Sequence, residues 1–367
     1  MNDYKKCKIC KNTKAIKELQ KQVKDLQKQI DLISDISGDN VNLGSFENPI
    51  DNIFVSNIVS NDFSLKGITL DDTTEELDPS FESFPRNWLR NDTPIAPIAS
   101  FRTYHYDGKT PDWIRWGIQN NLEVMIGITL EFYQTELNQL SVDYLTDPEL
   151  RRLYDINIIA IGVGNEESDI AQMNEGMIYA KSLISSGRLP RNAKVTTVLL
   201  NESAQWITPT YPPMSARFTQ NFLELYPNMD IICFNLYDGY SLTDPNVPIE
   251  VKLSWGNPLP SVTLNGFGAV RFAIDAAIRT EPNFVDKPFW CTEIGWESSG
   301  GNENSSLDNL RTFYNNFLLF NMMSTFIPQE STRAVRPPDR IFYFTIRDAN
   351  NETFGLYTAN PTLTPKF

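Results

Sequence analysis

Two glutamates stand directly after apolar runs of the kind that form buried strands. Glu166 follows the run 158–164 and Asn165, and Glu293 follows the run 288–292. Burying an isolated carboxylate is costly, so a charged group at the end of such a run should face a polar cleft. Two carboxyl groups that share a cleft can divide acid–base and nucleophilic work between them.

Hydrolysis of a glycosidic bond with retention of configuration needs such a pair, with carboxyl groups about 5–5.5 Å apart. We therefore predict that Glu166 is the general acid/base and that Glu293 is the nucleophile that forms a covalent glycosyl-enzyme intermediate. The charge of Glu293 should raise the pKa of Glu166. Asn165 should bind the sugar 2-hydroxyl. Tyr237 and Arg102 should hold Glu293 ionised, although a plain ion pair inside the fold is the alternative for Arg102.

The composition excludes several other chemistries. The chain has one histidine, His105, which argues against a Ser-His-Asp triad and against metal sites built from several histidines. Its 46 Asp and Glu against 32 Lys and Arg argue against a nucleic-acid partner, since the phosphate backbone draws on clustered cations. Four cysteines do not suggest a disulfide scaffold. No cofactor is expected.

Short apolar runs alternate with helical periodicity from about residue 63, which is typical of βα repeats and a parallel sheet. Helices are predicted over 110–120, 170–185, 266–279 and 306–322, with Asp169 as the N-cap of the second. Eight buried strands are predicted, at 65–70, 98–104, 123–129, 157–163, 194–200, 230–235, 288–293 and 341–346. These elements predict a (β/α)8 TIM barrel, in which functional groups lie at the carboxyl ends of the strands.

The amino-terminal part differs from this pattern. Residues 1–37 contain a Cys-x-x-Cys pair, Cys7 and Cys10, and then apolar residues at 16, 19, 23, 26, 30 and 33 in a heptad spacing. They predict a short coiled coil that forms a homo-oligomer, either a dimer or a trimer, through 16–33; an isolated amphipathic or disordered leader is the alternative. Residues 38–62 are predicted to be a linker and 63–367 the barrel. Metal binding by the cysteine pair stays open.

No apolar segment typical of a signal peptide or a membrane span is visible, so no membrane partner is expected. We expect a cytoplasmic or particle-associated protein, with the compartment itself unknown.

Several short motifs, in order along residues 63–367, resemble glycoside hydrolase family 17, the β-1,3-glucanases and related glucanosyltransferases. They are Arg102-Thr103-Tyr104, Gly164-Asn165-Glu166, Tyr211-Pro212-Pro213, Asn235-Leu236-Tyr237, Glu293-Ile294-Gly295-Trp296, Phe354-Gly355-Leu356 and Pro365-Lys366-Phe367. The resemblance implies a β-1,3-glucan substrate. It adds Asn235 and Glu352 to Asn165 and Arg102 as substrate-binding residues. Tyr104, Tyr237 and Trp296 are also predicted to bind substrate, because the C–H groups of a sugar ring favour an aromatic face.

The chain departs from the family pattern at Glu167, Asp238, Ile294 and Glu297, which flank the predicted catalytic residues. Linkage preference, endo or exo cleavage, and hydrolysis or transfer therefore stay open. Two alternatives remain: a carbohydrate-binding or structural barrel with little or no turnover, and a retaining β-1,4-glucanase or mannanase on the same fold.

Overall fold

The computed structural model describes the carboxyl-terminal part of the chain, with gaps. The described residues are 66–70, 98–120, 122–199, 222–237, 246–255, 266–268, 270–271, 274, 278, 286–300, 303–320, 322, 337–349, 352–358 and 364–367. The predicted coiled coil at 16–33, the cysteine pair, the linker and the Tyr-Pro-Pro segment lie outside these residues and stay predictions.

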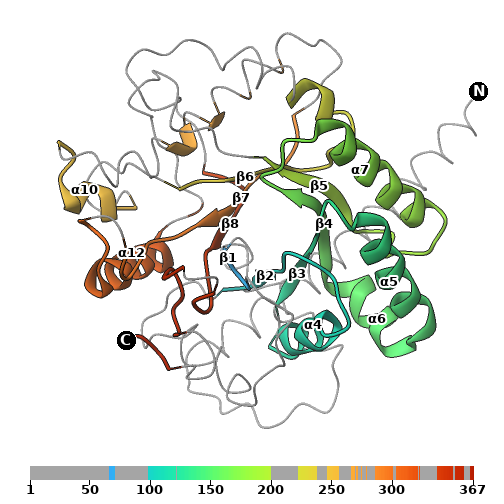
Figure 1. Ribbon diagram of the computed structural model, residues 1–367, viewed down its shortest axis with the longest axis horizontal. Helices are drawn as coiled ribbons and strands as arrows, with labels where there is room; N and C mark the ends of the chain where they lie inside the picture. The colour runs from blue at the N-terminus through green and yellow to red at the C-terminus, as the bar shows by residue number, and fades with distance from the viewer. Residues whose placement is uncertain are drawn as a thin grey trace, which may run out of the picture. The chain divides into compact units, whose positions relative to one another are not determined.

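Eight parallel strands form a closed barrel in the order β1 to β8, with β8 paired to β1 (Figure 1). They are β1 Lys66–Thr69, β2 Ser100–Arg102, β3 Glu123–Ile128, β4 Ile158–Asn165, β5 Lys194–Leu199, β6 Ile232–Asn235, β7 Phe289–Ile294 and β8 Arg340–Tyr343. Every strand overlaps its predicted range, so the (β/α)8 barrel is confirmed.

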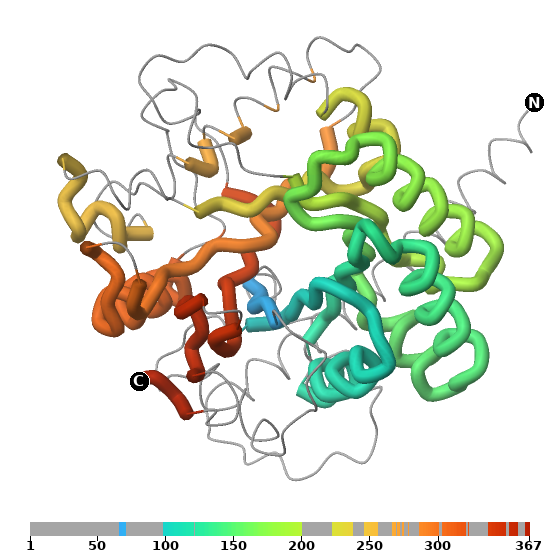
Figure 2. Tube along the Cα trace, viewed as in Figure 1, coloured from blue at the N-terminus to red at the C-terminus, as the bar shows by residue number. Residues whose placement is uncertain are grey.

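Helices lie outside the strands, with α4 to α7 beside β2 to β5 and α12 on the opposite side (Figures 1 and 2). Their bounds are α4 Thr110–Gln119, α5 Tyr133–Thr146, α6 Pro148–Asn157, α7 Ile170–Ser185, α10 Ile249–Leu253 and α12 Leu307–Leu319. The predicted helices at 110–120, 170–185 and 306–322 match α4, α7 and α12. Asp169 caps α7 by accepting a hydrogen bond from the backbone N–H of Gln172 at 2.9 Å, as expected.

The strands are buried on both faces, which explains why they are continuous apolar runs rather than alternating patterns. One apolar cluster contains Met125, Ala160, Val198, Ile231, Cys233, Trp290 and Phe342. A larger cluster joins residues of the strands to residues of α4, α5, α7 and α12. Trp113 and Trp116 belong to this larger cluster, so both rings pack in the core.

After β8, the described residues contain no helix. They are held instead by isolated bridges between Arg347 and Tyr357 and between Tyr357 and Pro365. No helix among the described residues is long and apolar enough to cross a membrane.

Candidate active site

The end of β4 turns sharply at Glu166. Gly164 has φ 79° and Glu166 has φ 58°, so both adopt the left-handed conformation that non-glycine residues rarely take. The pairing of β4 with β5 shifts in register between Gly162 and Asn165, and the Glu166 N–H then donates to the Val198 carbonyl at 3.0 Å. Such an irregularity re-aims the side chains at a strand end. In this protein the irregular end of β4 carries Glu166, whose side chain is half-buried.

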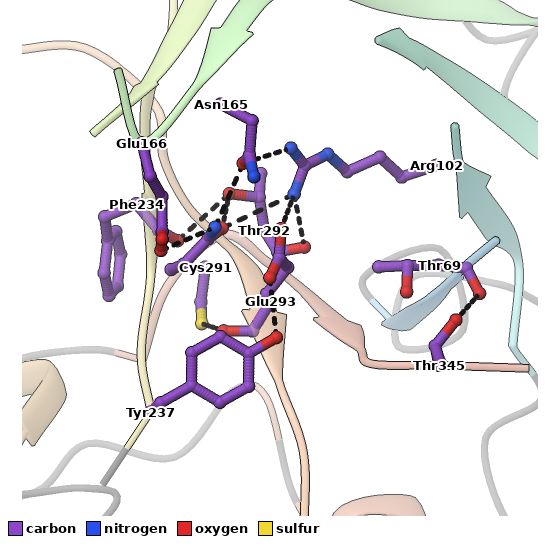
Figure 3. A network of polar contacts seen from close by, with 11 residues as sticks. Thr69, Arg102, Asn165, Glu166, Phe234, Tyr237, Cys291, Thr292, Glu293 and Thr345 are labelled. Carbon is purple, nitrogen blue, oxygen red and sulfur yellow. Dashed lines mark hydrogen bonds and ion pairs between the residues drawn. The ribbon is translucent and has the colours of Figure 1, made fainter. Parts of the chain in front are cut away.

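Glu293, on β7, is 4% exposed and receives two hydrogen bonds through its two carboxylate oxygens. Arg102 Nη1 donates to Oε1 at 2.8 Å, and the Tyr237 hydroxyl donates to Oε2 at 2.6 Å (Figure 3). Both donors were expected from the sequence to hold this carboxylate. Hydrogen bonds to the ionised form of a carboxyl group favour that form.

Two asparagines link the two glutamates. Asn235 lies beside Glu293 in the β6–β7 register, and its Nδ2 donates to Glu166 Oε1 at 3.0 Å and to Asn165 Oδ1 at 3.1 Å. Asn165 Oδ1 also accepts from Arg102 Nη2 at 2.7 Å. Because both donors bind Oδ1, the orientation of the Asn165 amide is determined by its partners. Figure 3 shows Arg102, Asn165, Glu166 and Glu293 converging from the ends of β2, β4 and β7.

These surroundings shift the pKa values of Glu166 and Tyr237. Burial, and then the nearby charge of Glu293, raise the pKa of Glu166 above its ordinary value, while Asn235 and Arg102 act in the opposite direction. Burial and the carboxylate of Glu293 also raise the pKa of Tyr237 well above its ordinary value, so its hydroxyl stays protonated and donates. The site therefore places a carboxyl group with a raised pKa, that of Glu166, beside Glu293, whose two carboxylate oxygens accept hydrogen bonds from Arg102 and Tyr237.

Aromatic rings surround this polar group. The ring of Tyr104 lies 4.4 Å from the Arg102 guanidinium carbon and contacts Phe344 edge-on at 6.2 Å between ring centroids. Tyr237 contacts Phe344 at 6.0 Å and Phe354 at 5.5 Å. These rings fix one another, because edge-to-face pairs restrict both partners.

The structure does not bring every predicted residue to this group. Trp296 is 2% exposed, packs against Phe313 of α12 at 5.3 Å, and donates its indole N–H to the Asn304 carbonyl. Its ring therefore packs α12 on the barrel, where little surface remains for a sugar. Glu352 is an exposed residue of the loop after β8. Stacking by Trp296 on a sugar gains no support from its position, whereas substrate contact by Glu352 stays a prediction.

Three residues of the site were missed by the sequence analysis. Thr292 donates its hydroxyl to Asn235 Oδ1 at 2.8 Å, and its carbonyl accepts from Arg102 at 3.1 Å. Phe344 and Phe354 supply rings next to Tyr237. Thr292 directly precedes a predicted catalytic residue, and this position was the available signal. Phe354 belongs to a motif that resembles the family, but its contact with Tyr237 and that of Phe344 depend on how distant segments pack, which the sequence does not indicate.

Two cysteines are buried in strands of the barrel, and two polar residues near the strand ends keep exposed surface. Cys233 and Cys291 are buried, and burial raises the pKa of Cys233 to about 12. Glu167 is exposed, and His105 is partly exposed near Asp107. Within the described part of the chain, no group of three His, Cys, Asp or Glu residues lies close enough to hold a metal ion.

The fold and the paired glutamates place the chain among (β/α)8 barrels with carboxyl groups at the strand ends. No protein-family model matches the sequence. Among solved structures, the chain is similar to a plant β-glucan endohydrolase, with 15% identity over 82% of this chain and 98% of that chain and a TM-score of 0.55. At this sequence identity, the similarity shows a shared fold and nothing more.

Two further likenesses have lower TM-scores. A family 39 glycoside hydrolase from the gut symbiont Bacteroides cellulosilyticus WH2 is 12% identical over 83% of this chain and 62% of that chain, with a TM-score of 0.49. A GH113 β-1,4-mannanase is 13% identical over 80% of this chain and 94% of that chain, with a TM-score of 0.45.

Proposed function

We propose that the protein is a retaining glycoside hydrolase that acts on β-1,3-glucan, with Glu166 as general acid/base and Glu293 as nucleophile. The observation that carries the proposal is that these two carboxyl groups meet in opposite environments. Arg102 and Tyr237 donate to Glu293, whereas burial and the charge of Glu293 raise the pKa of Glu166. Two neighbouring carboxyl groups in such different environments can divide the work, one as the acid and the other as the attacking group.

The reaction then runs in two steps. Glu293 attacks the anomeric carbon while Glu166 gives its proton to the departing glycosidic oxygen, which leaves a covalent glycosyl-enzyme. Glu166, now ionised, takes a proton from water or from a sugar hydroxyl, and that oxygen displaces Glu293 from the anomeric carbon. Asn165 is held with Oδ1 toward Arg102 and Asn235, so its Nδ2 serves as donor to the sugar 2-hydroxyl.

The choice of β-1,3-glucan is supported by the ordered motifs that resemble glycoside hydrolase family 17 and by the barrel shared with a plant β-glucan endohydrolase. An acidic protein of net charge −14 is also compatible with a neutral polysaccharide. The competing hypotheses are a retaining β-1,4-glucanase or mannanase and a binding barrel without turnover.

The test is incubation of the purified protein with hexaoses of β-1,3-glucan, β-1,4-glucan and β-1,4-mannan, with products followed by proton NMR. We expect β-configured products from the first substrate, and longer oligomers in addition if transfer occurs. Glu293→Gln should lose at least about 10³-fold in rate because it removes the nucleophile. Glu167→Gln is the matched control, since Glu167 is exposed, and should keep its activity.

Cleavage of only the β-1,4-linked substrates would refute the assignment of β-1,3-glucan and would support a β-1,4-glucanase or mannanase. Binding of the oligosaccharides without cleavage would make the protein a binding barrel and would refute the catalytic roles of Glu166 and Glu293.

A further inference from the structure

The chain segment after β8 carries two of the motifs singled out in the sequence, Phe354-Gly355-Leu356 and Pro365-Lys366-Phe367, and the catalytic roles proposed above use neither. The two motifs are joined in the structure, since Tyr357 pairs with Pro365 and the Lys366 N–H donates to the Leu356 carbonyl at 3.0 Å. They form one unit beside the loop that follows Glu293.

The ring of Phe354 is the part of this unit that reaches the candidate site. It contacts Tyr237 at 5.5 Å and Phe344 at 5.6 Å, both edge-to-face, and Tyr237 and Phe344 contact each other at 6.0 Å. Tyr237 in turn donates its hydroxyl to Glu293 Oε2 at 2.6 Å. The direction of that hydroxyl therefore depends on two phenylalanine rings, one from the end of β8 and one from the loop beyond it.

Both chain neighbours of Phe354 are held by hydrogen bonds. The Thr353 carbonyl accepts from Lys366 Nζ at 3.0 Å and from the backbone N–H and hydroxyl of Ser298, both at 2.9 Å. The Gly355 N–H donates to Asp348 Oδ1 at 2.8 Å. A residue fixed on both sides in this way keeps its ring in one place.

Lys366 is the centre of these contacts. Its side chain is 8% exposed, and Nζ lies 2.7 Å from both Asp348 Oδ1 and Ser298 Oγ, in addition to the Thr353 carbonyl. Asp348 and Thr353 belong to the loop after β8, while Ser298 belongs to the loop after β7. A single buried ammonium group thus joins the loop after Glu293 to the loop that carries Phe354.

We infer that Phe354 is a positioning residue for Glu293 that acts through the ring of Tyr237, and that Lys366 anchors it. This inference rests on the proposed function for its catalytic meaning. Removal of the Phe354 ring frees Tyr237 to rotate, so the hydrogen bond to Glu293 weakens although neither Tyr237 nor Glu293 has changed.

The catalytic test is a double-mutant cycle on kcat/KM with the β-1,3-glucan hexaose. Tyr237→Phe should lose about 10- to 100-fold, which corresponds to a hydrogen bond to a charged group. Phe354→Ala should lose about 10-fold, and the double variant Tyr237→Phe with Phe354→Ala should be little worse than Tyr237→Phe alone, because both changes remove the same interaction. Phe354→Tyr, which keeps the ring, should stay within about twofold of the wild type.

A second measurement is independent of turnover. In protein labelled with 13C at the tyrosine Cζ, Tyr237→Phe identifies the Tyr237 signal. Glu293→Gln as a single substitution should shift this signal, because the Tyr237 hydroxyl loses a charged acceptor. The same substitution added to Phe354→Ala should shift the signal much less. Lys366→Met should weaken the response in the same direction.

Phe222→Ala is the matched control, since Phe222 is a buried core residue that packs against Tyr226. It should lower stability and leave the Tyr237 response to Glu293→Gln intact. The inference is overturned if the losses of Tyr237→Phe and Phe354→Ala multiply, or if the Tyr237 signal responds equally with and without the Phe354 ring. A wild type that cleaves no glucan but shows the expected signal response refutes the proposed function and leaves the positioning role standing.

Discussion

Replacement of Arg102 tests whether the candidate site holds a buried, ionised carboxylate. The Arg102–Glu293 ion pair is 2.8 Å long, and the two side chains are only 2% and 6% exposed. Removing one partner of such a pair costs about 3–5 kcal/mol, because the other charge stays behind in a poorly solvated position. We expect Arg102→Met to lower the free energy of unfolding by this amount. With a urea m-value of about 3 kcal/mol/M, the midpoint falls by about 1–2 M.

The assay is urea unfolding of four proteins: wild type, Arg102→Met, Glu293→Gln and the double variant. Glu293→Gln added to Arg102→Met removes the stranded charge, so the double variant should recover about 2 kcal/mol relative to Arg102→Met. The rest of the loss remains, since Asn165 Oδ1 and the Thr292 carbonyl still lack the hydrogen bonds that Arg102 donates in the wild type. Equal midpoints for Arg102→Met and the double variant would refute the reasoning, because the loss would then not come from a buried charge.

Two further predictions concern the strand ends. The pKa of Glu166 is raised in the folded protein, so folding favours the neutral carboxyl group. The stability that depends on this neutral form is fully present below the ordinary pKa of 4.5 and is lost as pH rises through the folded-state pKa. Glu166→Gln should therefore raise the thermal midpoint at pH 7 but not at pH 4, measured by calorimetry; an equal gain at both pH values would contradict this sign. In Gly295→Ala, the new Cβ would lie 2.2 Å from the Phe344 carbonyl oxygen, so we expect a loss of about 1–3 kcal/mol in urea unfolding. Gly108→Ala is its control, because nothing lies within 4 Å of that Cβ, and a similar loss in both variants would show that the close approach is not the cause.

The barrel was predictable because its physical signals are local. A strand buried on both faces must be a continuous apolar run, and a helix that packs on it must repeat its apolar residues at helical spacing. The eight runs and the helix cap at Asp169 carry these signals within a few residues. The helices α5 and α6, which fill the β3–β4 connection, were not among the helices named from the sequence, although Asp147 caps α6 by accepting from the backbone N–H groups of Glu149 and Leu150.

Trp296 shows where local reasoning fails. In the sequence it follows Glu293 closely and has a ring suited to a sugar, but its neighbour in space is Phe313, which follows it in the chain on α12. Whether a ring faces a cleft or a helix depends on the path of the chain after the strand. The sequence marks Phe354 only as part of a motif that resembles the family. Its contact with Tyr237 depends on the packing of the loop after β8.

The sequence by itself determined the barrel and the two strand ends that carry Glu166 and Glu293, because a charged residue that closes an apolar run is costly anywhere but at a polar opening. It also pointed to Arg102 and Tyr237 as partners of Glu293. Only the tertiary structure decided that Asn235 connects the two glutamates, and that the chain end supports Tyr237 through Phe354. These contacts join residues far apart in the chain, and such distances are set by the closure of the barrel and the packing of its loops.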